Sequence, residues 1–247
     1  MKNPMLNIVI PMAGAGSRFS LAGYTDPKPL ILVHGKPMIK LVIENLTPTQ
    51  QHRFIFICQS SHVAKYDLRE KLNVWAPGCI VIEINGITEG AACTVLAAKS
   101  FIDNDSPLMI ANSDQFVDMD VNQYLDIFDN TFIDGLIMTM RASDPKWSFV
   151  GLDGDRNVTR VVEKKVISDE ATVGIYNFRQ GCSFISAAEA MIAKNERVNG
   201  EFYVAPVYNK LIAGGYRISI FNVGSEGAGM YGLGTPADLE FFLANGI

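Results

Sequence analysis

The sequence has little that would anchor the chain in a membrane or stabilise it through disulfides. It has no apolar run near the roughly 18 residues that a membrane span needs. Its N-terminus lacks the basic segment and long apolar stretch of a signal peptide. The four cysteines, Cys58, Cys79, Cys93 and Cys182, are far apart and have no nearby histidines. We therefore expect reduced, buried thiols, and a cytoplasmic protein that does not contact a membrane.

The sequence also lacks the excess of positive charge that is typical of nucleic-acid binding. It has 21 Lys and Arg against 26 Asp and Glu, a net charge of −5. We therefore expect no nucleic-acid partner. An anionic small ligand would have to be met by local cations, with a metal ion in addition. Hydrophobic residues make up 48% and charged residues 19% of the 247 residues, which is an ordinary globular composition.

Three familiar sequence motifs are absent. A P-loop requires Gly-x4-Gly-Lys-Ser/Thr, and no lysine follows Gly14 or Gly16 at that distance. A dinucleotide fingerprint requires a third glycine where this chain has Phe19, whose bulk would obstruct close packing of helix and strand. No serine lies in a Gly-x-Ser-x-Gly elbow. These absences argue against a P-loop NTPase, an NAD or FAD enzyme and a serine hydrolase.

The most informative segment that is present is a turn of small residues after the predicted strand Leu6–Pro11. Glycines there let backbone N–H groups approach a phosphate closely, and Arg18 and Lys28 follow as cations. Pro29 biases Lys28 toward an extended backbone. We assign Arg18 to a leaving pyrophosphate and Lys28 to the charge at an α-phosphate; the alternative is a tight turn whose glycines serve only the backbone. The predicted nucleotide-binding residues of the turn are Ala13, Gly14, Ala15, Gly16 and Ser17.

Strand-like and helix-like segments alternate in the first half of the chain. This alternation predicts right-handed βαβ units and a largely parallel sheet. Ligands bind at the carboxyl ends of such strands, so the Gly14 turn and Asn112-Ser113-Asp114 can face one pocket. The predicted strands are Leu6–Pro11, Arg53–Cys58, Cys79–Ile84 and Leu108–Asn112, and the predicted helices are Pro37–Leu46, Val63–Leu72 and Ala91–Lys99.

The second half is predicted to contain four strands, two helices, a further strand and a last helix. Asp153-Gly154 is typical of a hairpin turn. Thr235 followed by Pro236 predicts the start of the last helix, which ends near Asn245. The strands are Asp134–Met140, Ser148–Leu152, Val158–Glu163, Ala171–Phe178 and Arg217–Asn222, and the two earlier helices are Ser183–Lys194 and Val204–Ala213.

Asp114 is the strongest candidate for a metal ligand, because it directly follows an apolar strand whose carboxyl end would face the cleft. Magnesium usually takes one or two protein carboxylates, with phosphate and water completing its shell. Asp120 with Gln123 fits a helix capping box instead. A second turn contributes Thr88, Gly90 and Ala91, whose small side chains would admit a flat base, although Thr88 could equally cap the helix.

The second half supplies candidate contacts for an acceptor. Glu163 and Lys164 end a predicted strand, and the lysine could hold a second phosphate or simply be exposed. Trp147, Glu201 and Tyr203 lie near predicted element boundaries, where they could line an acceptor pocket or merely pack.

Together these motifs resemble the nucleoside-diphosphate-sugar pyrophosphorylases, also called sugar-phosphate nucleotidyltransferases, over nearly the whole chain. The resemblance rests on Gly14-Ala15-Gly16-Ser17-Arg18-Phe19 with Pro27-Lys28-Pro29-Leu30. It implies a three-layer α/β/α Rossmann-like fold, similar to glycosyltransferase A, with a mixed, mainly parallel sheet. The resemblance implies Mg²⁺ on Asp114, base recognition by the Thr88–Ala91 turn and nucleotide binding at Ser113. It also implies acceptor binding by Glu163, Lys164, Gly174 and Glu201.

The function that the resemblance implies is transfer of a nucleotidyl group from a nucleoside triphosphate to a small phosphate acceptor, with release of pyrophosphate. The expected acceptor is a sugar 1-phosphate and the expected product a precursor of capsule or lipopolysaccharide. We expect one domain, 1–247, with a nucleotide-binding half (about 1–115) and an acceptor-binding half (about 116–247). The base, the acceptor and the formation of a homo-oligomer stay open.

One departure and three alternatives accompany this prediction. The family commonly has an aspartate, its second metal ligand, where this chain has Gly232, so either Asp114 and phosphates suffice or another carboxylate such as Glu201 substitutes. The first alternative is a cytidylyltransferase for a non-sugar phosphate such as phosphoglutamine. The second is a glycosyltransferase that uses a nucleotide sugar, with Ser113-Asp114-Gln115 as its metal motif, and the third is a non-catalytic nucleotide sensor.

Overall fold

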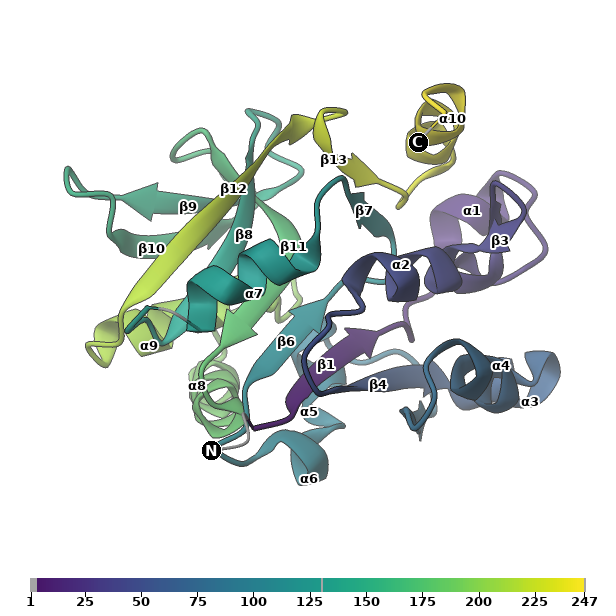
Figure 1. Ribbon diagram of the computed structural model, residues 1–247, viewed down its shortest axis with the longest axis horizontal. Coiled ribbons are helices and arrows are strands. Elements are labelled where there is room, and N and C mark those ends of the chain that lie inside the picture. Colours follow the sequence, from purple (N-terminus) through teal and green to yellow (C-terminus); the bar gives the residue numbers. More distant parts are fainter. Residues whose placement is uncertain (1–3, 130, 247) are drawn as a thin grey trace.

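The computed structural model describes residues 4–129 and 131–246, which fold around one large mixed sheet (Figure 1). The strands are β1 (Leu6–Pro11), β4 (His52–Gln59), β5 (Ile80–Ile84), β6 (Leu108–Ala111), β7 (Gln115–Val117), β8 (Gly135–Arg141), β9 (Ser148–Leu152), β10 (Val158–Glu163), β11 (Glu170–Phe178), β12 (Ile218–Glu226) and β13 (Gly229–Gly232), and a separate hairpin is formed by β2 (Leu32–Val33) and β3 (Lys36–Pro37). The helices are α1 (Ser17–Leu21), α2 (Met38–Leu46), α3 (Ser60–Tyr66), α4 (Leu68–Trp75), α5 (Ala91–Leu96), α6 (Lys99–Ile102), α7 (Val121–Asp129), α8 (Gly181–Ala193), α9 (Tyr208–Ala213) and α10 (Pro236–Ala244), with 3₁₀ turns η1 (Lys28–Leu30) and η2 (Ala205–Val207).

The strand order is β5-β4-β1-β6-β11-β8-β12-β13-β7, with β9 and β10 attached beside β11. Strands β5, β4, β1 and β6 are parallel, as the alternating pattern of the first half predicts. Strand β11 then lies antiparallel between β6 and β8 and joins the two halves of the chain in one sheet. The predicted α/β fold with a mixed central sheet is confirmed.

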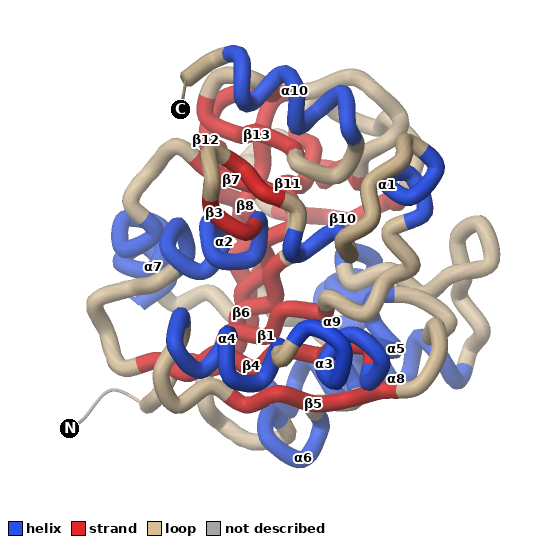
Figure 2. Tube along the Cα trace, turned by 90° about the vertical axis from the view of Figure 1, so that its right-hand side faces the viewer, coloured by secondary structure: helices blue, strands red, loops and turns tan. Residues whose placement is uncertain are grey.

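Helices cover both faces of this sheet, which makes three layers (Figure 2). On one face α2, α4 and α7 bury apolar side chains such as Val42, Leu72 and Tyr124 against the strands. On the other face α5, α8 and α9 do the same with side chains such as Val95 and Phe184. Because the sheet is covered on both faces, its inner strands are continuously apolar. Ile8, Val9 and Ile10 of β1, for example, are each 0% exposed.

A third, smaller apolar cluster brings the C-terminal helix to the N-terminal loop. Phe19 of α1 packs there with Leu233, which follows β13, and with Phe242 of α10. Figure 1 shows the consequence, since α10 and α1, the two ends of the colour scale, lie on the same side of the molecule. This cluster holds the glycine-rich turn next to the chain's last strand and helix.

Several elements differ in detail from the sequence prediction. The helix predicted at Val63–Leu72 is two helices, because Asp67 has a left-handed backbone with φ 51 and interrupts it. The helix predicted at Ala91–Lys99 ends at Leu96, and the one predicted at Val204–Ala213 begins with the 3₁₀ turn η2. The short strands β7 and β13 carry no periodic signal of their own, since β7 forms by pairing with β13, and β13 by pairing with β7 and β12.

The predicted turns and caps are partly confirmed. Strands β9 and β10 form the expected hairpin, but its loop closes between Asp153 and Asn157 rather than as a two-residue turn. Thr235 caps α10 by accepting a hydrogen bond from the Asp238 amide at 3.1 Å. Asp120 caps α7, but its carboxylate accepts from the Asn122 amide at 2.9 Å, one residue earlier than the capping box predicts.

In the part of the chain that the structure describes, every helix is too short or too polar to cross a membrane.

Candidate active site

The glycine-rich turn leaves β1 at the carboxyl edge of the parallel strands, beside the end of β6. Gly16 has φ 61, in the left-handed region, where an L side chain would be strained. Its Cα lies against Lys28, because a Cβ there would be 3.5 Å from the Lys28 Cβ. The Ala13 carbonyl accepts a hydrogen bond from the Gln59 side chain at 2.6 Å. The turn is therefore held from β4 and from the Lys28 segment.

Lys28 and Asp114 meet at this edge. The Lys28 Nζ donates to Asp114 Oδ2 at 2.8 Å, and the two side chains are 24% and 22% exposed. A Cβ on Gly234 would lie 2.9 Å from the same oxygen, so the carboxylate fits against a wall that has no side chain at that point. Sequence analysis predicted both residues for the site, and the structure brings them into contact.

The donor set at Asp114 suits a hard divalent cation. Its carboxylate oxygen already holds a cationic group, the Lys28 ammonium. Within the described ranges no group of three or more metal-ligating side chains exists. Mg²⁺ needs no such group, since it usually binds one or two carboxylates and fills its remaining positions with phosphate and water. The residues present therefore fit Mg²⁺ that takes most of its ligands from phosphate and water.

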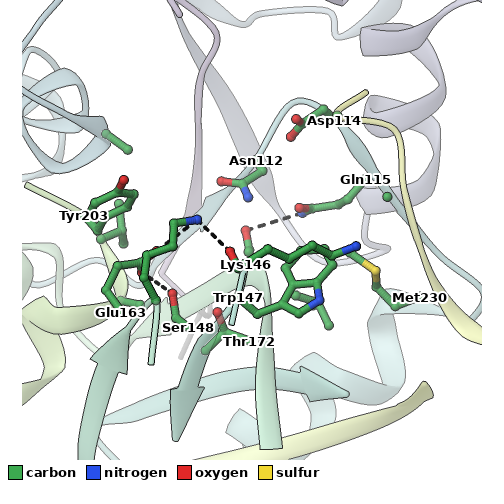
Figure 3. Close-up of a pocket in the computed structure, with 18 of the residues that line it drawn as sticks. Asn112, Asp114, Gln115, Lys146, Trp147, Ser148, Glu163, Thr172, Tyr203 and Met230 are labelled. Atoms are coloured by element: carbon green, nitrogen blue, oxygen red, sulfur yellow. Dashed lines mark hydrogen bonds and ion pairs between the residues drawn. The ribbon is translucent and has the colours of Figure 1, made fainter. Parts of the chain in front are cut away.

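A cavity of about 520 Å³ opens next to Asp114 (Figure 3). The close-up shows Asn112, Asp114 and Gln115 on one side, with Ser148 and Glu163 across the cavity from them. The predicted site residues that line it are Arg18, Ala91, Asp114, Trp147, Glu163, Lys164, Gly174 and Tyr203. Nucleotide-side and acceptor-side candidates from distant parts of the sequence thus share one cavity.

The acceptor side of the cavity is built around Glu163 at the end of β10. Its buried carboxylate accepts a hydrogen bond from the Ser148 hydroxyl, and the Lys164 Nζ lies 3.6 Å from it. Burial raises the pKa of Glu163, against the lowering effect of these two partners. Lys164 has φ 57, and its Nζ also donates to the Lys146 carbonyl at 2.6 Å. The Lys164 ammonium thus lies on the wall of the cavity beside Glu163, although the residue is exposed to solvent.

Tyr203 lies next to Lys164 on the wall of the cavity, and its phenol stays protonated at neutral pH. Burial, together with the charges of Glu201 and Glu163, raises its pKa to about 12. The Lys164 Nζ lies 5.7 Å from the centre of its ring. The Trp147 indole Nε1 is buried and has no hydrogen-bond partner among the described residues. Tyr203 and Trp147 therefore give this polar cavity two aromatic walls.

The remaining predicted site residues, all within the described part of the chain, do not line the cavity. They are Ala13, Gly14, Ala15, Gly16, Ser17, Lys28, Thr88, Gly90, Ser113 and Glu201. The small-residue turn and Lys28 lie next to it through the contact with Asp114. Ser113 is 4% exposed and buried between Asn112 and Asp114, both of which line the cavity. The side chain that reaches the cavity before Asp114 is therefore Asn112 rather than the predicted Ser113.

Gly90 and Thr88 have structural partners that sequence analysis did not foresee. Gly90 has φ 128, and a Cβ there would lie 2.4 Å from the Phe202 carbonyl oxygen. The Phe202 backbone also bonds to Glu89 and Ala92 on either side of Gly90. The Thr88 hydroxyl does not cap α5. It donates a hydrogen bond to the Gly90 carbonyl oxygen at 3.0 Å instead. The close approach of two backbones is by itself enough to require a glycine at position 90.

Several polar residues of the cavity have no assigned role in the sequence prediction: Asn112, Gln115, Lys146, Ser148, Thr172, Tyr176 and Asp238. Of these, the sequence analysis names Asn112 only in the segment that can face the pocket, and Gln115 only in the metal motif of the glycosyltransferase alternative. Gly174, with φ 85, gives space to two of them, since a Cβ there would lie 2.1 Å from the Asn112 amide nitrogen and 2.7 Å from Gln115 Oε1. Successive residues of an extended segment point to opposite sides, so the assignment of Asp114 to the cavity could have indicated that Asn112, two residues earlier, faces it as well. No sequence signal marks Lys146 or Asp238, which reach the cavity through the fold.

The fold and this cavity define an α/β protein with a polar cavity at the carboxyl edge of its parallel strands, lined by Arg18, Lys164 and Asp114 among others. Comparison with known proteins agrees: residues 8–206 match the nucleotidyl transferase family. The chain belongs to this family. The predicted resemblance, and the expected class of enzyme, are confirmed at that level.

Individual relatives are more distant. The chain is 28% identical to the solved nucleoside-diphosphate-sugar pyrophosphorylase of Vibrio cholerae RC9, with a TM-score of 0.78 and coverage of 96% of this chain and 99% of that one. The inositol-1-phosphate CTP transferase of T. maritima shares the fold, at 16% identity, a TM-score of 0.74 and coverage of 100% and 99%. The bifunctional protein GlmU of Burkholderia orbicola (strain AU 1054) is 27% identical over 220 residues, 86% of this chain and 46% of that protein. This chain thus spans about half the length of that relative.

Proposed function

We propose that the protein transfers a nucleotidyl group from a nucleoside triphosphate to a small phosphate acceptor and releases pyrophosphate. The observation that carries this proposal is the contact between Lys28 and Asp114 at the edge of the sheet, with Arg18 on the same cavity. One carboxylate and two cations in this position suit a triphosphate. The family match and the likeness to a nucleoside-diphosphate-sugar pyrophosphorylase support the same activity.

The proposed mechanism is direct attack of an acceptor phosphate oxygen on the α-phosphorus, in line with the leaving pyrophosphate. Such a reaction needs positioning and neutralisation of charge more than a covalent nucleophile. Amides of the turn from Ala13 to Gly16 bind the nucleotide, Arg18 binds the leaving pyrophosphate and Lys28 neutralises charge at the α-phosphate. Asp114 would hold Mg²⁺, which when bound neutralises phosphate charge. Lys164 holds the acceptor phosphate.

The acceptor that the cavity suits best is a sugar 1-phosphate. The cavity offers hydroxyl, amide and carboxylate groups, from residues such as Ser148, Gln115 and Glu163. Such groups pair with the several hydroxyls of a sugar, while Trp147 can cover its apolar face. Lys164 next to Glu163 supplies a cation for the phosphate. A role of the product in surface polysaccharide synthesis stays a prediction, as do the single domain and the cytoplasmic location.

Thermal unfolding with a panel of ligands tests the nucleotide half of this proposal. The panel is CTP, UTP, dTTP, ATP and GTP, each with and without Mg²⁺, beside several nucleotide sugars. A triphosphate at about 100 times its dissociation constant stabilises the fold by about 2.7 kcal/mol, which is a shift of about 5–11 °C for a protein of this size. A shift with one triphosphate supports the proposal and identifies the base. A shift with nucleotide sugars alone contradicts it and favours a glycosyltransferase.

Release of pyrophosphate tests the acceptor half. With the identified triphosphate and Mg²⁺, a panel of sugar 1-phosphates and non-sugar phosphates such as phosphoglutamine is added, and pyrophosphate is measured. Release that depends on a sugar 1-phosphate supports the proposed acceptor. Release with a non-sugar phosphate alone keeps the transferase and replaces the acceptor. Triphosphate binding with no release for any acceptor contradicts catalysis and favours a sensor.

A further inference from the structure

The end of β13 and the segment that joins it to α10 have one face of apolar side chains and one face of glycines, which carry no side chain. Tyr231 and Leu233, 7% and 0% exposed, pack into the small cluster with Phe242. Gly232 and Gly234 alternate with them, and in an extended chain successive residues point to opposite sides. Both glycines line the cavity. The wall of the cavity is therefore bare backbone at these two positions.

Two carboxylates lie against this bare wall. A Cβ on Gly234 would lie 2.9 Å from Asp114 Oδ2, and a Cβ on Gly232 would lie 3.8 Å from Asp238 Oδ2. The two positions are about 6–7 Å apart along an extended chain. The Leu233 amide donates to the Asp114 carbonyl at 2.8 Å, which fixes the wall to the residue that carries the first carboxylate. Asp114 and Asp238 thus come from distant parts of the sequence to one patch of the cavity.

Asp238 is held in place in the first turn of α10. Its backbone amide donates to Thr235 Oγ1, at a helix end where the dipole favours a negative charge. Its carboxylate forms no ion pair with any residue that the structure describes, although it interacts electrostatically with Lys146, which is itself paired with Glu226. The wall therefore presents one carboxylate that is paired with Lys28 and a second one that forms no ion pair among the described residues.

We propose that Asp238 supplies the second carboxylate to the divalent cation that Asp114 would hold. This inference rests on the proposed nucleotidyl transfer and deepens it. Two carboxylates are within the number that Mg²⁺ usually takes from a protein. Glu201, the substitute that sequence analysis considered, is exposed and outside the described lining of the cavity. Asp238 lines the cavity beside the bare wall, and Glu201 does not.

Binding of Mn²⁺, measured by electron paramagnetic resonance on the full chain, tests the proposal. The variants are Asp238→Asn and, as a matched control, Glu240→Gln, an exposed carboxylate on the same helix that loses the same charge. Asn keeps the backbone amide that bonds to Thr235, so α10 keeps its cap. We expect Asp238→Asn to weaken Mn²⁺ binding about 10-fold or more, on the scale of losing a group that supports a metal. Glu240→Gln should stay within about twofold of the unchanged chain.

A double variant separates a metal ligand from a structural residue. Because a Cβ at position 232 points toward the Asp238 carboxylate, Gly232→Asp combined with Asp238→Asn returns a carboxylate to the same patch. We expect the double variant to recover Mn²⁺ binding. Unchanged Mn²⁺ affinity in Asp238→Asn would overturn the proposal, and so would a weakened affinity that the double variant does not restore.

The failure of this inference can be told apart from that of the proposed function. Mn²⁺ affinity is measured without nucleotide or acceptor, so it does not depend on catalysis. If the protein without substitutions releases no pyrophosphate, the proposed function is contradicted. The comparison of Mn²⁺ affinities between the variants still decides the role of Asp238.

Discussion

The contact between Lys28 and Asp114 gives the lysine two roles. It competes with a metal ion for the Asp114 carboxylate, and it neutralises phosphate charge when a nucleotide is bound. The two atoms lie 2.8 Å apart, and about a quarter of each side chain is exposed. Coulomb's law at this distance gives about 6 kcal/mol with an effective dielectric constant of about 20, and about 1.5 kcal/mol in water. Loss of hydration and partial exposure leave a net interaction of about 1–2 kcal/mol. A cation that binds Asp114 Oδ2 must displace the ammonium from that oxygen.

Replacing Lys28 by Ala should therefore have two opposite effects. Without nucleotide, the affinity of Asp114 for Mn²⁺ should rise about 5–30-fold, the factor that corresponds to 1–2 kcal/mol. With triphosphate and acceptor, turnover should fall about 100-fold or more, the scale of removing one donor that stabilises the transition state. Metal titration followed by electron paramagnetic resonance and release of pyrophosphate measure the two effects.

A matched control is available on the surface. Lys36 pairs with Glu44 at the same distance, 2.8 Å, but both side chains are more than 40% exposed, at 51% and 43%. Lys36→Ala should change neither Mn²⁺ affinity nor turnover. Near-normal turnover in Lys28→Ala would refute the catalytic role of the lysine. Unchanged Mn²⁺ affinity would refute the argument that it competes with the metal.

Two further predictions concern stability. Gly90→Ala should lower the free energy of unfolding by about 3 kcal/mol or more, because its Cβ would meet the Phe202 backbone at 2.4 Å and its φ of 128 strains any L side chain. Its melting temperature should therefore fall by about 6–12 °C. Gly154→Ala has open space around its Cβ, so its melting temperature should lie within about 2 °C of that of the protein without substitutions. Burial raises the pKa of Glu163, so its contribution to stability is present below the ordinary glutamate pKa and is lost as pH rises through the raised one. Glu163→Gln lacks this loss, so its melting temperature relative to the unchanged protein should increase between pH 4 and pH 7, and a difference independent of pH would show that Glu163 titrates normally.

Local sequence chemistry determined the nucleotide side of this protein. The pattern of apolar runs separated by helical segments predicts β1, β4, β5 and β6, because strands of a sheet covered on both faces are mostly apolar. Parallel strands end at one edge, so the turn near Gly14 and the carboxylate of Asp114 could be assigned to one pocket before the fold was known. Arg18 and Lys28 could be named because phosphate charge requires cations beside a turn of small residues.

Tertiary structure alone decided how the other side of the cavity is built. Asn112 and Gln115 reach it because Gly174 in β11 leaves space for their amides, and β11 pairs with β6 from a distant part of the sequence. Asp238 comes beside Asp114 because burial of Leu233 and Phe242 against α1 docks the last helix onto the N-terminal turn. These contacts depend on long-range packing that no local pattern encodes, since each partner is an ordinary polar or apolar residue within its own segment.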